Sequence, residues 1–296
     1  MLRLFLQLDD ELGGDALYPL LAQYVGRLAV AVQGGHQADL VGFGQLAQLA
    51  GWLALDANLQ APARRYFTTA LYVAHEADDP ALAASSLAYM SLQETYAARP
   101  QSALALAQTA VIGGSSRLTR LTRTMLGTRL ARAHANLGQR TDCERVIDRT
   151  RTSFAESGEW DEPQWLSYVD EVEVAAQEGA CYLALGMTAE ASAALNRAIS
   201  LLTRDAPHRV RDHVHYLSRL ATCHLVDGDV EGACGVAVEG LTLATAIGSA
   251  RVFDRLHEFR AALRPHHRVA AVRAFEERFE ATMPVRDQPA TGEGPG

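Results

Sequence analysis

The most regular feature of the chain is a recurrence of small residues among longer apolar side chains. One small residue stands at each of five anchor positions, which follow one another in steps of 40, 40, 48 and 42 residues: Ala63, Ala103, Cys143, Ala191 and Ala233. A second set, mostly small, stands twelve residues before the anchors: Gly51, Ser91, Ala131, Gly179 and Ala221. Two antiparallel helices pack closely where small side chains face each other. The spacing therefore predicts five helix pairs, with each anchor in the second helix of its pair.

Residues that favour turns stand between these two sets. Five residues before the anchors the chain carries Asn58, Ala98, Gly138, Gly186 and Gly228. Glycine, and less often asparagine, ends a helix in the left-handed conformation, so we expect the turn inside each pair at this position. Asp229 follows the last of these turns and is a natural N-cap for the next helix.

The same pattern decides the fold class. No stretch shows sustained alternation of apolar and polar residues, so we expect no β-sheet. The prediction is an all-α fold, a tetratricopeptide-like right-handed superhelix of about five helix pairs with flanking helices. A loop at 156–163 accounts for the longest step. We divide the chain into a leading helical segment at 1–35, the repeat array at 36–248, closing helices at 249–284 and a disordered tail, rich in Pro and Gly, at 285–296.

The architecture also predicts which side chains face the concave groove. In a tetratricopeptide stack the first helix of each pair lines this face, and its inward positions recur at helical spacing before each anchor. These positions carry aromatic, amide and charged groups: Gln45, Gln48, Trp52, Tyr89, Tyr96, Arg129, Arg132, Asn136, Glu173, His215 and Arg219. Such a mixture suits an extended peptide or a small ligand. The alternative for each residue is that it only packs or faces solvent.

Charge and composition narrow the function classes. The 296 residues carry 27 basic against 35 acidic side chains, a net charge of −8, and every basic residue is arginine. Since nucleic-acid affinity comes largely from phosphate neutralisation, we expect no direct nucleic acid binding by this chain. The absence of lysine excludes a Walker A loop and a Schiff-base lysine. No window of 18 apolar residues occurs, so we expect no membrane span and a cytoplasmic location.

Three motifs invite a chemical interpretation. Residues 42–47 (GFGQLA) fit a dinucleotide fingerprint, but that motif must follow a strand, and here it begins a predicted helix. The histidines cluster without the spacing of zinc ligands. Cys181 and Cys223 occupy equivalent positions of successive repeats, which indicates interior packing. We therefore expect no cofactor, no metal and no enzymatic activity, with a reactive thiol as the alternative for the cysteines.

Arginines gather on one predicted helix, and an acidic run follows at 156–173. The arginines are Arg117, Arg120, Arg123, Arg129 and Arg132. One interpretation is a solvated surface whose charges pair with one another. The other is a stripe that binds an anion or a peptide carboxylate, because arginine forks favour such groups.

Four runs carry a resemblance to a known family: residues 5–14 (FLQLDDELGG), 51–56 (GWLALD), 63–71 (ARRYFTTAL) and 165–173 (WLSYVDEVE). Together they resemble the C-terminal tetratricopeptide portion of actinobacterial transcriptional regulators with a helix-turn-helix of the xenobiotic-response-element (XRE) type. In that family a DNA-binding domain precedes this region, whereas no helix-turn-helix sequence precedes residue 5 here. We expect either a fragment of such a regulator or a free-standing sensor.

The functional prediction joins the groove and the resemblance. We expect a non-catalytic, regulatory ligand- or peptide-binding domain of a bacterial transcriptional regulator. The alternative is a constitutive protein–protein interaction scaffold, which the repeat architecture alone would support. The partner would be a peptide, small molecule or protein in the concave groove, and the sequence leaves a homodimer open.

Overall fold

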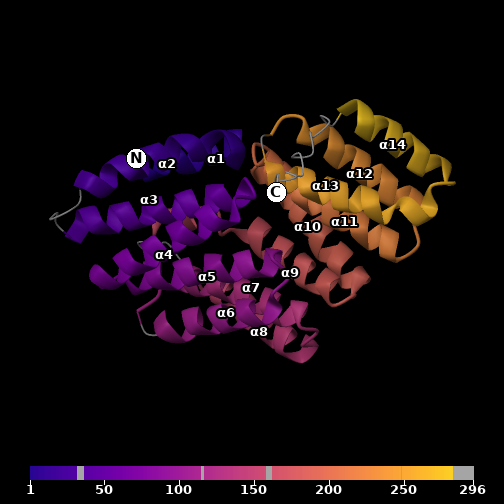
Figure 1. The fold of residues 1–296 in the computed structure, drawn as a ribbon. Coiled ribbons are helices and arrows are strands. Elements are labelled where there is room, and N and C mark those ends of the chain that lie inside the picture. The colour runs from indigo at the N-terminus through magenta and orange to yellow at the C-terminus, as the bar shows by residue number, and fades with distance from the viewer. Residues whose placement is uncertain (32–36, 115–116, 158–161, 248, 283–296) are drawn as a thin grey trace, which may run out of the picture.

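The computed structural model describes residues 1–31, 37–114, 117–157, 162–247 and 249–282, and every regular element among them is helical (Figure 1). Fourteen α-helices and two 3-10 turns follow one another along this part of the chain. Their bounds are α1 Leu2–Leu12, α2 Gly14–Ala31, α3 Gln37–Asp56, α4 Gln60–Glu76, α5 Pro80–Tyr96, α6 Pro100–Gly114, α7 Arg120–Asn136, α8 Arg140–Ala155, η1 Gln164–Leu166, α9 Glu171–Ala184, α10 Thr188–Asp205, α11 Val210–Val226, α12 Val230–Ala244, α13 Ala250–Ala262, η2 Arg264–His266 and α14 Ala270–Thr282.

Helices α3 to α12 form the five predicted pairs. All five anchor residues are completely buried. The five predicted turn residues adopt the left-handed conformation, with φ between 54° at Ala98 and 81° at Gly228. Asp229 caps α12 as expected, because its side chain accepts a hydrogen bond from the backbone N–H of Gly232 at 2.9 Å. The repeat pattern, including the turn inside each pair, is therefore confirmed.

Close contact between the two helices of a pair explains the second set of small residues. A Cβ atom built on Gly51 would lie 2.5 Å from Cδ1 of Phe67, and one on Gly179 would lie 2.6 Å from Cγ of Leu195. At the equivalent place in the second pair, Ser91 donates a hydrogen bond to the backbone oxygen of Ala103 at 2.7 Å. Small residues at this position let the helix backbones approach each other.

The superhelix curls until its two ends meet. Figure 1 shows α1 and α2 beside the first pair and α13 and α14 beside the last, with both groups side by side at one edge. Asp9 of α1 forms an ion pair with Arg211 of α11 at 2.6 Å. Asp56, completely buried at the end of α3, accepts a hydrogen bond from Ser249 at 3.0 Å and pairs with Arg251 of α13 at 3.1 Å. These contacts join residues about two hundred positions apart.

The predicted loop at 156–163 lies partly outside the described residues, as does the whole predicted tail at 285–296. Immediately after this loop, η1 turns toward the concave face, where Trp165 and Leu166 are buried. Among the described helices, none combines the length and apolar character needed to cross a membrane.

Candidate functional site

A cavity of about 590 Å³ lies on the concave side of the superhelix. Its wall contains residues from the first helix of every pair, α3, α5, α7, α9 and α11. Helix α1, the segment around η1, three residues between α10 and α11 and one residue of α13 complete the wall. The concave face is therefore formed by the helices that the repeat pattern assigned to it, and it is covered by elements outside the pairs.

Nine of the eleven side chains predicted for the groove line this cavity: Gln45, Gln48, Trp52, Tyr89, Tyr96, Arg129, Glu173, His215 and Arg219. The other two, Arg132 and Asn136, are absent from its wall, because they stand on the last turns of α7, beyond the cavity. Their placement differs from the expectation, while the role of all eleven in binding stays a prediction.

Aromatic rings form one wall. Tyr89 is buried and stacks on Phe67 with centroids 5.6 Å apart, and Trp52 packs against the same tyrosine at 5.9 Å. The Tyr89 hydroxyl lies 3.4 Å from that of Tyr168, which follows η1. Burial raises the pKa of Tyr89 well above its usual value, so its hydroxyl remains a neutral hydrogen-bonding group.

The amide and carboxylate groups of the wall are partly committed to the protein. Gln48 is buried, and its Oε1 atom accepts hydrogen bonds from Ser85 and, at 3.3 Å, from Ser86. Glu173 forms an ion pair with Arg129 at 3.3 Å. Burial raises the pKa of Glu173, although Arg129 opposes the shift.

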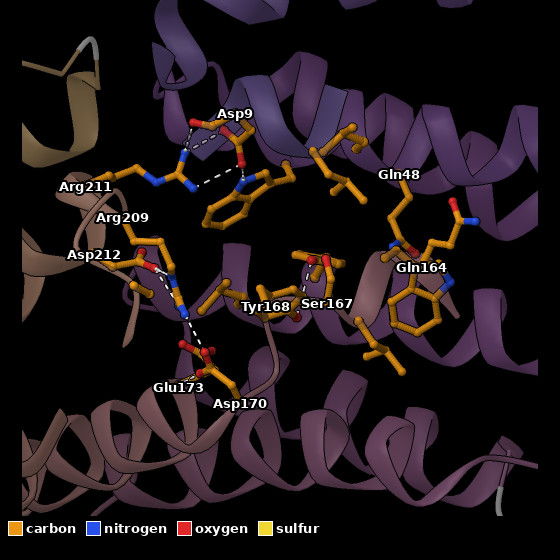
Figure 2. Close-up of a pocket in the computed structure, with 18 of the residues that line it drawn as sticks. Asp9, Gln48, Gln164, Ser167, Tyr168, Asp170, Glu173, Arg209, Arg211 and Asp212 are labelled. Carbon is orange, nitrogen blue, oxygen red and sulfur yellow. Dashed lines mark hydrogen bonds and ion pairs between the residues drawn. The ribbon is translucent and has the colours of Figure 1, made fainter. Parts of the chain in front are cut away.

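Two further arginines hold the covering elements in place, as Figure 2 shows. Arg209 bridges Asp170 and Asp212, each at 2.7 Å. Arg211 binds both carboxylate oxygens of Asp9, whose Oδ2 atom also accepts a hydrogen bond from the Trp52 indole at 2.9 Å. These networks attach α1 and the segment before α9 to helix α11.

Several polar atoms that line the cavity are buried without a hydrogen-bond partner among the described protein groups. They include Nε of Arg129, both carboxylate oxygens of Glu162, Nε2 of His215 and the hydroxyl of Tyr216. Burial, together with nearby arginines such as Arg251 and Arg219, holds the pKa of His215 well below its usual range, so its imidazole is neutral. Buried polar groups are nearly always hydrogen-bonded, so these atoms mark places where the cavity can contact a ligand.

The structure also shows where the glycine motif at residues 42–47 and the predicted arginine stripe lie. Residues 42–47 lie inside α3 rather than at a strand-to-helix turn, in agreement with the helical interpretation. The arginine stripe is divided: Arg117 pairs with Asp78 at 3.0 Å and Arg120 pairs with Glu156, with all four side chains exposed. Arg129 instead points to the cavity, so the predicted stripe is not one binding surface.

Sequence reasoning missed Asp9, Tyr168, Arg209 and Arg211. Arg211 stands four residues before His215, so extending the inward spacing of this helix by one turn would have found it. Nothing in the local sequence indicates that Asp9 reaches the fifth pair. That placement depends on the curvature of the whole superhelix.

Among solved structures, the chain is similar to BtubC (BKLC) from P. vanneervenii, with 13% identity over 85% of this chain and 92% of that chain and a TM-score of 0.52. Two others have scores below 0.5. One is the apo form of the quorum sensor NprR from B. thuringiensis, with 12% identity, coverage of 90% and 79%, and a TM-score of 0.48. The other is a Podosopora anserina putative kinesin light chain with nearly identical TPR-like repeats, with 14% identity, coverage of 77% and 98%, and a TM-score of 0.42. No family model and no curated protein matches the sequence. At these identities the likeness concerns the fold alone, and it rests on the first structure.

Proposed function

We propose that the chain is a regulatory, non-catalytic domain that binds a short peptide or a small molecule in its concave cavity. One observation carries this proposal: the first helices of all five pairs contribute to a single cavity of about 590 Å³. That size falls within the range of about 300–1,000 Å³ typical of ligand pockets. Aromatic faces and unpartnered polar atoms in its wall supply both contact area and hydrogen bonds.

The covering elements favour a small ligand over a constitutive scaffold. A scaffold needs an open groove that admits part of a folded partner. Here α1 and the segment around η1 take part in the cavity wall, and the Asp9–Arg211 and Arg209–Asp170 ion pairs hold both elements to α11. A ligand of a few residues fits this geometry better than a protein domain does.

The regulatory part of the proposal rests on the resemblance to the tetratricopeptide portion of XRE-type regulators. A ligand that binds between the two ends of the superhelix would favour either the closed or a more open arrangement of these ends. Such a shift between two conformations can transmit a signal. With its net charge of −8, the chain would act on transcription through a partner or a separate domain rather than through nucleic acid contacts of its own.

A thermal-shift screen against short peptides and metabolites tests this function, because a ligand that binds the folded state raises its stability. We expect at least one probe to give a saturable shift.

Gln45 lines the cavity and Gln108 is exposed on α6, so Gln45→Trp and Gln108→Trp form a matched pair. We expect Gln45→Trp to weaken binding at least tenfold and Gln108→Trp to leave it unchanged. Ligand binding that is unchanged in Gln45→Trp would favour the scaffold. So would the absence of any thermal shift together with a protein partner whose binding is also unchanged in Gln45→Trp.

A further inference from the structure

Arginines surround the Tyr96 side of the cavity, and most of them have a carboxylate partner. Arg129 pairs with Glu173 at 3.3 Å, Arg251 with Asp56 at 3.1 Å, and Arg255 with Glu258 at 3.1 Å. The first two pairs belong to the cavity wall and to the closure of the superhelix, while Arg255 and Glu258 form a surface pair within α13.

Arg132 of α7 and Arg219 of α11 differ from these arginines. Among the described residues, neither forms an ion pair with a carboxylate, and the Nη1 atom of Arg132 is buried without a hydrogen-bond partner. Arg219 lines the cavity, while Arg132 is not part of its wall. The groups near Arg132 that could become anionic are the Cys181 thiol and the Tyr96 hydroxyl, both far weaker acids than a carboxylate.

The charges of Arg132 and Arg219, together with those of the paired Arg251 and Arg255, shift the pKa values of neighbouring groups. Burial, together with the charges of Arg132 and Arg255, lowers the pKa of Arg219 to about 10. Burial would raise the pKa of the Tyr96 hydroxyl, yet Arg251 and Arg219 lower it below its usual value. The cavity of an acidic protein therefore contains a region of positive potential next to Tyr96.

We propose that Arg219, reinforced by Arg132, is a subsite that binds an acidic group of the ligand, a carboxylate or a phosphate. This inference rests on the proposed binding function and names the chemical class of the ligand. A guanidinium presents a planar fork of donors that matches both kinds of oxyanion. The aromatic wall of Trp52 and Tyr89 then receives the apolar remainder of the same molecule.

The same geometry separates a binding role from a structural one. An arginine that holds the fold together is paired, so its removal leaves a buried carboxylate alone and destabilises the protein. An arginine that binds an anionic ligand has no carboxylate partner in the ligand-free protein. Replacing it with a neutral residue therefore removes its repulsion of neighbouring arginines and the cost of burying its charge. Arg209, which also lines the cavity and is paired with Asp170 and Asp212, is the structural counterpart of Arg219.

The experiment compares Arg219→Gln, Arg209→Gln and the exposed-site control Arg65→Gln in the full chain. Without ligand, we expect Arg219→Gln to melt at or above the wild-type temperature and Arg209→Gln to melt several degrees lower.

The probes for binding are mixtures of N-acetylated pentapeptides with a free C-terminal carboxylate, the same mixtures with a C-terminal amide, and phenyl phosphate. We expect binding of the free acids or of phenyl phosphate to weaken at least tenfold in Arg219→Gln and to persist in Arg65→Gln. Which of the two anions binds identifies the acidic group.

Two results would overturn the subsite. One is equal affinity for the carboxylate and amide mixtures together with no binding of phenyl phosphate. The other is unchanged affinity for the anionic probe in Arg219→Gln. In both cases a probe still binds, and its sensitivity to Gln45→Trp then tests the proposed function separately. If no probe binds, charged or neutral, the binding function and the subsite fall together.

Discussion

At the scale of single residues, the close packing of two of the helix pairs depends on positions occupied by glycine, which has no side chain. Gly51 and Gly179 occupy the same place in their repeats, and each faces a large apolar residue of the second helix, Phe67 or Leu195. Glycine is a poor helix former, so its use in the middle of a helix has to be offset by packing. Here the close packing of the two helices of a pair compensates for the low helix propensity of glycine.

This packing makes the effect of an alanine substitution depend on position. In α3, Gly51→Ala would place a Cβ atom 2.5 Å from Phe67, whereas a Cβ atom on Gly42 meets nothing within 4 Å. We expect Gly51→Ala to lower the free energy of unfolding by about 1–3 kcal/mol through overpacking. We expect Gly42→Ala to raise it by about 0.5–1 kcal/mol, because alanine is the better helix former. Urea denaturation measures both, and two substitutions of the same sign would contradict this account.

At the scale of elements, the turn inside each pair has one backbone geometry and several sequences. Three repeats have glycine at the left-handed position, the first has Asn58 and the second has Ala98, with φ of 54°. An L-residue other than glycine is strained in this conformation. The second repeat therefore contains a turn that its sequence does not favour, and the neighbouring helices impose it.

Exchanging the residues between two turns tests this explanation. Ala98 and Gly138 are both outside the core, so packing does not obscure the backbone effect. We expect Ala98→Gly to raise the free energy of unfolding by about 0.5–1 kcal/mol and Gly138→Ala to lower it by about 1–2 kcal/mol. Chemical denaturation of the two variants checks the prediction. A loss of stability in Ala98→Gly would show that relief of left-handed strain does not govern the stability of this turn.

At the scale of the whole molecule, buried ion pairs join the first helices to the last. Asp56 is central to this closure, because Arg251, Ser249 and the backbone N–H of Gly14 all contact its carboxylate. Burial raises the pKa of Asp56, but Arg211 and Arg251 outweigh it, and the net pKa lies below the usual value of 3.8. The folded protein thus favours the ionised form.

A lowered pKa of a carboxylate implies stability that disappears in acid. The contribution of Asp56 is complete well above the usual pKa of the unfolded state and is lost as the pH falls through the lower pKa of the folded state. We expect Asp56→Asn to lower the free energy of unfolding by about 3–5 kcal/mol at pH 7, because it leaves the largely buried Arg251 without its carboxylate partner. Below about pH 4 the difference from the wild type should shrink.

Urea denaturation across pH 3 to 7 measures this effect. Asp148→Asn is the control, since Asp148 pairs with Arg151 at 3.5 Å on the surface and should contribute less than about 1 kcal/mol. A difference between wild type and Asp56→Asn that stays constant down to pH 3 would show that ionisation of Asp56 does not stabilise the closed superhelix.

The helix pairs, their turns and the inward-facing positions of the first helices follow from the amino-acid sequence alone. Each of these features depends on residues less than about twenty positions apart, such as Gly179 with Ala191, and helical geometry converts that spacing directly into direction. Nine predicted groove residues therefore line one cavity, from Gln45 to Arg219.

The closure of the groove and the identity of its unpaired charges depend instead on the packing of the whole chain. The Asp9–Arg211 pair spans 202 positions, and its formation depends on small rotations that accumulate over five successive helix pairs. Arg129 and Arg132 stand one turn apart on α7, yet only Arg129 meets a carboxylate among the described residues. No local pattern distinguishes the two, because the partner comes from another repeat and its distance is set by packing between helices.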